Sequence, residues 1–290
     1  VDDSSHSIVY DPSKFILCGK CVRMCDELQN VRAIDFMERG NDTYISCGEG
    51  YRLADSSCTG CGQCAAVCPT GALMLKSSIE RLRAAIADPG KKLAVQIAPA
   101  VRIGLAEEFG LAPGRSVMGK AVTALKLLGA DYVYDTSMRA YQTVICEAED
   151  FAAKRGTGTV FSSYCPAWVR HVECDYQQLM PQLYTAGSHM EVCAALIRLK
   201  HAGSGVISAA VMPCSAAKSE AERPELIKNG DRLVDIVLST QELAEIIREN
   251  GMNFAALPET PCDGLYSQIT AESECLSPIL LSIDESRCIG

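Results

Sequence analysis

Residues 58–69 read CTGCGQCAAVCP, so Cys58, Cys61, Cys64 and Cys68 stand in one run that ends on a proline. This C-x2-C-x2-C-x3-C-P spacing is the one with which bacterial ferredoxins bind 4Fe-4S clusters. The two-residue gaps let three thiolates of one loop reach the same cubane, while the fourth cysteine ligates a neighbouring cluster. The stretch therefore predicts a two-cluster ferredoxin-like fold, and a second cysteine run that completes it.

The second run lies upstream, at residues 15–25, and lacks its first cysteine. It reads FILCGKCVRMC, so Phe15 stands where the first ligand is expected. Because the fourth cysteine of each run ligates the other cluster, the thiols divide into two groups. The four-thiol group is Cys25, Cys58, Cys61 and Cys64, and the three-thiol group is Cys18, Cys21 and Cys68. The first group predicts a complete 4Fe-4S cluster, and the second predicts a cluster that is labile or has three irons.

Phe15 leaves three outcomes open, because a phenyl ring cannot bind iron. The site recruits another donor such as Cys47, binds water, or loses one iron, and we rank the loss of iron first. Gly48 and Gly50 beside Cys47 indicate a turn, which favours a simple loop thiol. Paired C-x2-C elements also occur in zinc ribbons, but the third and fourth cysteines of each run argue against zinc.

Composition excludes several classes of function. The chain has 290 residues, of which 48% are hydrophobic, and a net charge of -9 with no run rich in Lys and Arg, so nucleic acid is not an expected partner. Eight of its 16 cysteines lie in the first 68 residues in tight repeats, which indicates metal ligation and not a disulfide framework. Apolar stretches such as 93–101 and 206–213 are far shorter than the ~20 residues of a membrane-spanning helix. The first residues show no secretory signal pattern, so we expect a cytoplasmic protein.

After residue 78 short apolar runs alternate with amphipathic segments. Strands are expected at residues 92–98, 131–134, 158–162, 206–212 and 233–238, and helices at residues 77–88, 117–128, 142–154, 169–179, 190–200 and 241–249. Several of these strands are almost wholly apolar, as buried parallel strands are. We therefore expect a two-cluster ferredoxin-like domain at residues 1–78 and an α/β domain with a partly parallel sheet at residues 79–290.

Cys165 and Cys214 each follow a predicted strand, and each lies beside a proline. Folds of the α/β class place their sites at the carboxyl ends of strands, so these two thiols are expected to converge on a further iron-sulfur centre. Cys174 and Cys193 lie on predicted helices instead. A buried cysteine there is usually a small hydrophobic residue.

The order of these motifs resembles the iron-only (FeFe) hydrogenases. The ferredoxin pair is followed by APAVR at 98–102, SSYCPAW at 162–168 and MPCSAAKSE at 212–220. In that family the active H-cluster is a 4Fe-4S cubane joined through a thiolate to a diiron subcluster, and it interconverts protons, electrons and dihydrogen. The resemblance implies an anaerobic oxidoreductase with a redox partner such as ferredoxin. It also assigns roles to residues of the two longer motifs: Cys165 and Cys214 as cubane ligands, Met212 and Pro213 as cofactor contacts, and Glu220 as a catalytic residue.

The proton path of the family is altered in this chain. Tyr164, at a catalytic position, stands where the family has a proton-transferring cysteine. A phenol with a pKa near ~10 is a poorer relay at neutral pH than a thiol near ~8.5. The glutamate that continues the usual path aligns with Cys146, although Glu147 and Glu149 are close. We therefore expect slow proton transfer.

Two further positions depart from the family pattern. The lysine that hydrogen-bonds a cyanide ligand is replaced by Ala217, with Lys218 one place later. The third motif, Cys-x3-Cys, is absent, and the last 26 residues offer only Cys275 and Cys288. Either the domain is incomplete or altered at its C-terminus, or a partner subunit supplies the missing ligands, or the domain holds no full H-cluster.

These observations leave more than one function open. The first is an FeFe-hydrogenase-like oxidoreductase that oxidises H2, reduces protons or senses H2 through a ferredoxin-type relay. The second is an electron-transfer iron-sulfur protein with a degenerate hydrogenase domain. A third, related to the hydrogenase-like proteins of cytosolic iron-sulfur assembly, also keeps clusters without hydrogen chemistry. The order of the motifs favours the first.

Overall fold

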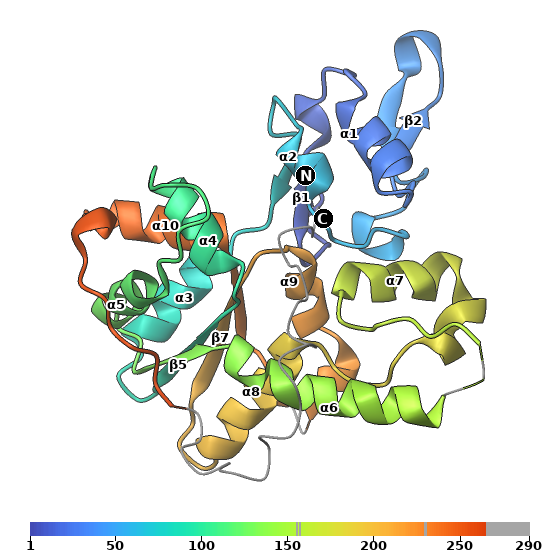
Figure 1. Cartoon of the computed structure of the whole chain (residues 1–290). Coiled ribbons are helices and arrows are strands. Elements are labelled where there is room, and N and C mark those ends of the chain that lie inside the picture. Colours follow the sequence, from blue (N-terminus) through green and yellow to red (C-terminus); the bar gives the residue numbers. More distant parts are fainter. Residues whose placement is uncertain (155, 157, 229–230, 265–290) are drawn as a thin grey trace.

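The computed structural model describes residues 1–264, with the exception of residues 155, 157, 229 and 230. We call residues 1–78 the head and residues 79–264 the body; Figure 1 shows the head above the helices of the body. Cys275 and Cys288 lie outside the described residues. None of the helices in the described part of the chain is long and apolar enough to cross a membrane.

The head consists of two antiparallel strand pairs and two short helices that begin within the cysteine runs. β1 (Ile8–Tyr10) pairs with β4 (Leu73–Leu75), and β2 (Asp35–Met37) pairs with β3 (Tyr44–Ser46). Helices α1 (Lys20–Arg23) and α2 (Gln63–Ala66) follow Gly19 and Gly62, which adopt φ angles of 72° and 79°. Glycine tolerates this left-handed conformation without strain, so both C-x2-C loops turn into their helices in the same way.

The body is built on a four-stranded parallel sheet in the order β10-β7-β5-β6. Its strands are β5 (Leu93–Ile97), β6 (Tyr132–Asp135), β7 (Ile207–Met212) and β10 (Ile236–Ser239). All five residues of the central strand β5 are buried, as expected for a parallel strand covered on both faces. A short pair, β8 (Ile227–Lys228) and β9 (Asp231–Arg232), lies outside this sheet.

Helices cover both faces of the sheet. On one side lie α3 (Ile79–Ala87), α4 (Val101–Glu108), α5 (Met118–Leu128) and α10 (Thr240–Glu249), and on the other α6 (Ser137–Ala153) and α8 (His189–Lys200) (Figure 1). Helices α7 (Pro166–Asp175) and α9 (Ala216–Ala221) pack against each other near the head. The predicted α/β class is thus confirmed.

Most predicted elements are confirmed, and three differ from the prediction. The strand expected at 158–162 is wrong: the segment is largely exposed, Gly158 has a φ of 117°, and Phe161 makes only an isolated bridge to Leu183. The helix expected at 169–179 ends at Asp175 and continues as a 3-10 turn that contains Pro181. Helix α4 was not predicted. Cys193, by contrast, is fully buried on α8 within the core, as expected.

Candidate metal centres and active site

The thiols of the head lie in two groups. Burial raises the pKa of the Cys64 thiol well above its usual value, and the nearby Cys58 and Cys61 thiols raise it further. Burial likewise raises the pKa of Cys21, with Cys68 and Cys18 adding to the effect. Thiols must lose their protons to bind iron, so these raised values mean that cluster binding releases protons. Cys64 is thus close to Cys58 and Cys61, and Cys21 is close to Cys18 and Cys68, as the crossover between the two runs predicts.

The two groups face different surroundings. Cys58 lines a cavity together with residues of α7 and α9, and Cys61 lines another with residues of α4 and α10. Cys18 is exposed, and its neighbour Ile16 is 63% exposed. The four-thiol group therefore faces the body, whereas the three-thiol group has an exposed member, Cys18, beside the buried Cys21.

Phe15 fills part of the head's core. Its ring lies 5.2 Å from that of Tyr10, centroid to centroid. Cys47 donates from its Sγ to the Tyr51 carbonyl at 3.4 Å and lines a separate cavity with Asp2. In the described residues, no three His, Cys, Asp or Glu side chains are close enough to hold a single metal ion.

Cys165 and Cys214 lie at the starts of two helices that pack together. Cys165 is the N-cap residue of α7, and Cys214 lies between β7 and α9. Their neighbours line one cavity of about 660 Å³, Ser163 and Pro166 on one wall and Ala216 and Ser219 on another. Cys58 and Thr59 of the head line the same cavity. The structure thus brings the two motifs and the four-thiol group to one place.

Tyr164 is surrounded by groups that the sequence did not assign. Its ring lies 4.5 Å from that of His189, centroid to centroid, and its backbone N–H donates to Ser162 Oγ. Ser162 Oγ in turn donates to Glu147 Oε1 at 3.0 Å. Burial lowers the pKa of His189 to about 4, so this imidazole is neutral at pH 7. Glu147 is therefore the carboxylate that reaches the first motif, one residue after the position at which the resemblance placed it.

The buried Glu220 forms a pair with a second, partly buried carboxyl group. Its side chain bonds Glu191 and Ser188, and it is 7% exposed. Burial, and then the charge of Glu191, raise the pKa of Glu220 well above its usual range. Ser188 caps α8 by accepting a bond from the Glu191 N–H at 3.2 Å. Two carboxyl groups in contact share a proton most easily, so this pair is suited to hold one.

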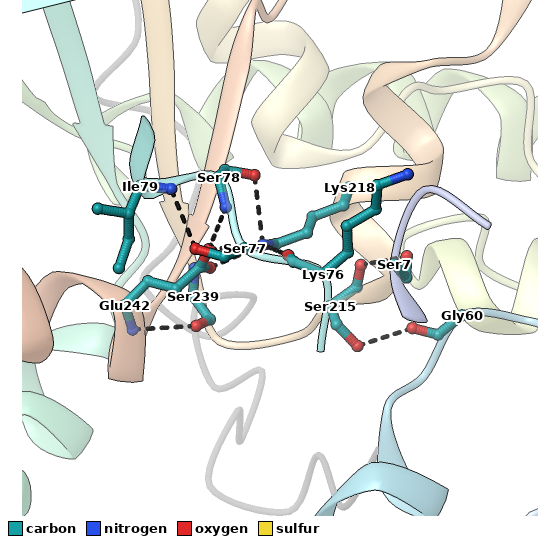
Figure 2. Close-up of polar contacts among 10 residues, drawn as sticks. All are labelled: Ser7, Gly60, Lys76, Ser77, Ser78, Ile79, Ser215, Lys218, Ser239 and Glu242. Atoms are coloured by element: carbon teal, nitrogen blue, oxygen red, sulfur yellow. Dashed lines mark hydrogen bonds and ion pairs between the residues drawn. The ribbon is translucent and has the colours of Figure 1, made fainter. Parts of the chain in front are cut away.

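Lys218 is directed away from the motif that contains it. Its Nζ lies 2.7 Å from Glu242 Oε2 and also donates to the Lys76 carbonyl and Ser78 Oγ (Figure 2). Both charged side chains are buried, at 4% and 9% exposure. Because this ammonium already bonds three groups at the junction with the head, it does not replace the lysine missing at Ala217.

Met212 ends β7 and is buried, whereas Pro213 lines the cavity that Cys61 also lines. Pro213 therefore faces the head in this structure. The role of both residues as cofactor contacts stays a prediction.

Comparisons with known proteins agree with this arrangement. The profile of the family described as "Iron only hydrogenase large subunit, C-terminal domain" matches residues 91–277, and a 4Fe-4S dicluster profile matches residues 14–72. The chain belongs to the iron-only hydrogenase family. It is 37% identical over 276 residues to "NADP-reducing hydrogenase subunit HndD" of Solidesulfovibrio fructosivorans, covering 90% of this chain and 47% of that protein. "Iron hydrogenase 1" of Clostridium pasteurianum is 34% identical over 279 residues, covering 92% and 49%.

Other matches of this hydrogenase-family chain include a solved structure and a protein of different name. A structure of [FeFe]-hydrogenase HydA1 from Chlamydomonas reinhardtii has a TM-score of 0.62 and 31% identity, over 66% of this chain and 51% of that one. "Cytosolic iron-sulfur assembly component 3" of Mus musculus is 28% identical over 247 residues, covering 77% and 52%. The chain spans about half the length of the curated relatives it matches.

Three residues of the hydrogenase-family site were not singled out as functional from the sequence: Glu191, His189 and Ser162. The pattern Ser188-x-x-Glu191 is a recognisable helix-start signal, and it could have located α8 and its first-turn glutamate. No local pattern indicates that Glu191 meets Glu220, since the two lie on different helices.

Proposed function

We propose that this chain is an FeFe-hydrogenase-like iron-sulfur oxidoreductase of low turnover, with a head at residues 1–78 that relays electrons to a centre in the domain at residues 79–290. The observation that carries this proposal is the shared cavity, which the neighbours of Cys165 and Cys214 line together with Cys58. Two thiols are available to a bound centre: Cys165 is the N-cap of α7, where the helix dipole favours a thiolate, and Cys214 lies in the turn between β7 and α9. A diiron group bound there would supply the hydrogen chemistry.

The chain's own residues would hold and move protons around this centre. At the first motif Ser162 Oγ donates to Glu147 and accepts a bond from the backbone N–H of Tyr164, and Glu220 with Glu191 forms a second acidic site. Tyrosine exchanges protons slowly at neutral pH, which supports a slow enzyme or a hydrogen sensor. A ferredoxin-like redox partner and a partner subunit are part of this proposal. A cytoplasmic location stays a prediction, because the relatives' names include a periplasmic and a cytosolic protein.

The test is an anaerobic preparation supplied with the diiron cofactor. More than about eight irons per chain, with CO and cyanide stretches in the infrared, are expected. The matched control is Cys214→Ala, which should lose the infrared bands and keep the irons of the head. About eight irons or fewer and no bands in the unchanged protein would contradict the proposal.

A second candidate is an iron-sulfur electron carrier without hydrogen chemistry. It is favoured by Lys218, which bonds the junction and leaves Ala217 at the usual lysine position. Tyr164→Cys separates the candidates, since the thiol titrates closer to neutral pH. The variant should speed hydrogen-dependent dye reduction in a hydrogenase and leave an electron carrier inactive.

A further inference from the structure

Ser215, the residue after Cys214, is bonded to the head on both sides. Its hydroxyl donates to the Gly60 carbonyl at 2.7 Å, and its own carbonyl accepts a bond from Ser7 Oγ at 2.7 Å (Figure 2). Ser215 is 5% exposed. Gly60 lies directly before Cys61, so one hydrogen bond connects neighbours of the two cysteines.

The close approach at this point depends on two glycines of the head. A Cβ at Gly60 would lie 2.8 Å from Ser7 Oγ, and a Cβ at Gly62 would lie 2.5 Å from Ser215 Oγ. Both glycines also have positive φ angles, 70° and 79°, which other residues rarely adopt. The loop that carries Cys61 is therefore shaped to let the body's serine reach its backbone.

We propose that Ser215 is the electron-transfer contact between the cluster of the four-thiol group and the centre at Cys214. The path leads from Cys61 through the Gly60 peptide and the hydrogen bond to Ser215, and then along the backbone to Cys214. One electron leaves the head cluster, which is oxidised, and enters the body centre, which is reduced; no covalent bond changes. This inference rests on the proposed function, because it needs a centre at Cys214.

Other contacts at the junction hold head and body together without lying on this path. Ser219 Oγ shares a hydrogen bond with Ser7 Oγ at 2.7 Å, and Lys218 bonds the linker at Lys76. Neither connects a neighbour of Cys61 to a neighbour of Cys214. Electron tunnelling weakens more steeply across a gap than along covalent and hydrogen bonds, so only the Ser215 bond should set the rate. Tyr176 offers a control, since its hydroxyl accepts a bond from Asn30 of the head at 3.4 Å and lies outside both motifs.

The test follows the spread of electrons through the full chain loaded with its clusters. After rapid reduction, freeze-quenched EPR spectra resolve the reduction of the head clusters and of the body centre. Ser215→Ala should slow the reduction of the body centre several-fold and leave the reduction of the head clusters unaffected. Tyr176→Phe, which removes only the hydroxyl that bonds Asn30, should leave both rates unchanged, and Ser215→Thr, which keeps the hydroxyl, should transfer electrons at the normal rate.

Each result decides the matter. A Ser215→Ala protein with unchanged timing, or a Tyr176→Phe protein that is delayed equally, would overturn the role of Ser215. If Ser215→Ala does not keep its iron, a Ser215→Thr protein with full iron and slow transfer would overturn it as well. Absence of any body centre in the unchanged chain, shown by its iron content, would instead refute the proposed function and this inference with it.

Discussion

The two thiol groups of the head hold similar positions in their runs but differ in ligands and in surroundings. The four-thiol group is partly buried and faces the body, where Cys58 and Cys61 line cavities with body residues. The three-thiol group lacks a ligand at Phe15 and has an exposed cysteine, Cys18. The four-thiol group thus lies where the head meets the body, and the three-thiol group has a member that is open to solvent. We infer that a full set of four thiol ligands is needed for electron transfer from the head to the body. A full set is dispensable where electrons enter the head.

The largest expected difference is between cysteine substitutions in the two groups. Cys64→Ser should remove a cluster of about four irons and lower the melting temperature strongly, because the thiol lies in the head's core. Cys18→Ser should remove the other cluster with a smaller loss of stability, since this thiol is exposed. Iron content and thermal unfolding of both variants measure this. Equal losses of stability would contradict this prediction and show that both thiol groups contribute equally to the stability of the fold.

The junction provides the next largest effect. Lys218→Met should destabilise the protein by about 3–5 kcal/mol, because it leaves the buried Glu242 carboxylate without its partner. The control is Lys14→Met, near the three-thiol group. The Lys14 side chain is 44% exposed, so its ion pair with Asp11 contributes about 0–1 kcal/mol to stability. Chemical unfolding compares the two. Similar small losses would mean that the junction does not depend on its ion pair.

The contrast between the two groups follows from local sequence only in part. The C-x2-C spacing predicts the thiol groups, because ligands two residues apart are fixed by one loop. The parallel strands could be predicted from apolar runs such as 207–212. That Ser215 meets Gly60, or that Lys218 bonds Lys76, depends on packing between segments more than 140 residues apart, which no local pattern encodes. The false strand at 158–162 has the same cause, since a short apolar run predicts a strand only where a neighbouring strand is available.

The acidic pair beside the four-thiol group makes stability depend on pH. The pKa of Glu220 is raised in the folded state, so its contribution is full below the ordinary pKa of about 4.3 and is lost as pH rises through the raised value. The Glu220→Gln protein should therefore be more stable than the unchanged protein at pH 8 to 9. The gain is about 1.4 kcal/mol for each pKa unit by which folding raises the pKa of Glu220. The difference should vanish as pH falls toward the ordinary glutamate pKa of about 4.3. Melting temperatures across this range measure it.

The exposed Glu225, which lines the same cavity, provides the control for this pH effect. Glu225→Gln should show no such trend, because its carboxylate stays in water. A parallel trend in both variants would assign the effect to overall charge and not to the buried pair.

The smallest effect concerns the incomplete site itself. Phe15→Cys should place a thiol where the run lacks one, raise the iron content by about one per chain and abolish the EPR signal of an oxidised three-iron cluster. It should also cost about 1–2 kcal/mol, less than for a fully buried Phe, because the half-buried ring loses its contact with Tyr10. Phe15→Leu removes the ring without adding a ligand, so it should match the loss of stability and gain no iron. If the iron content of Phe15→Cys stays unchanged, the three-thiol site already has a fourth donor, and the two halves of the head differ in exposure but not in completeness.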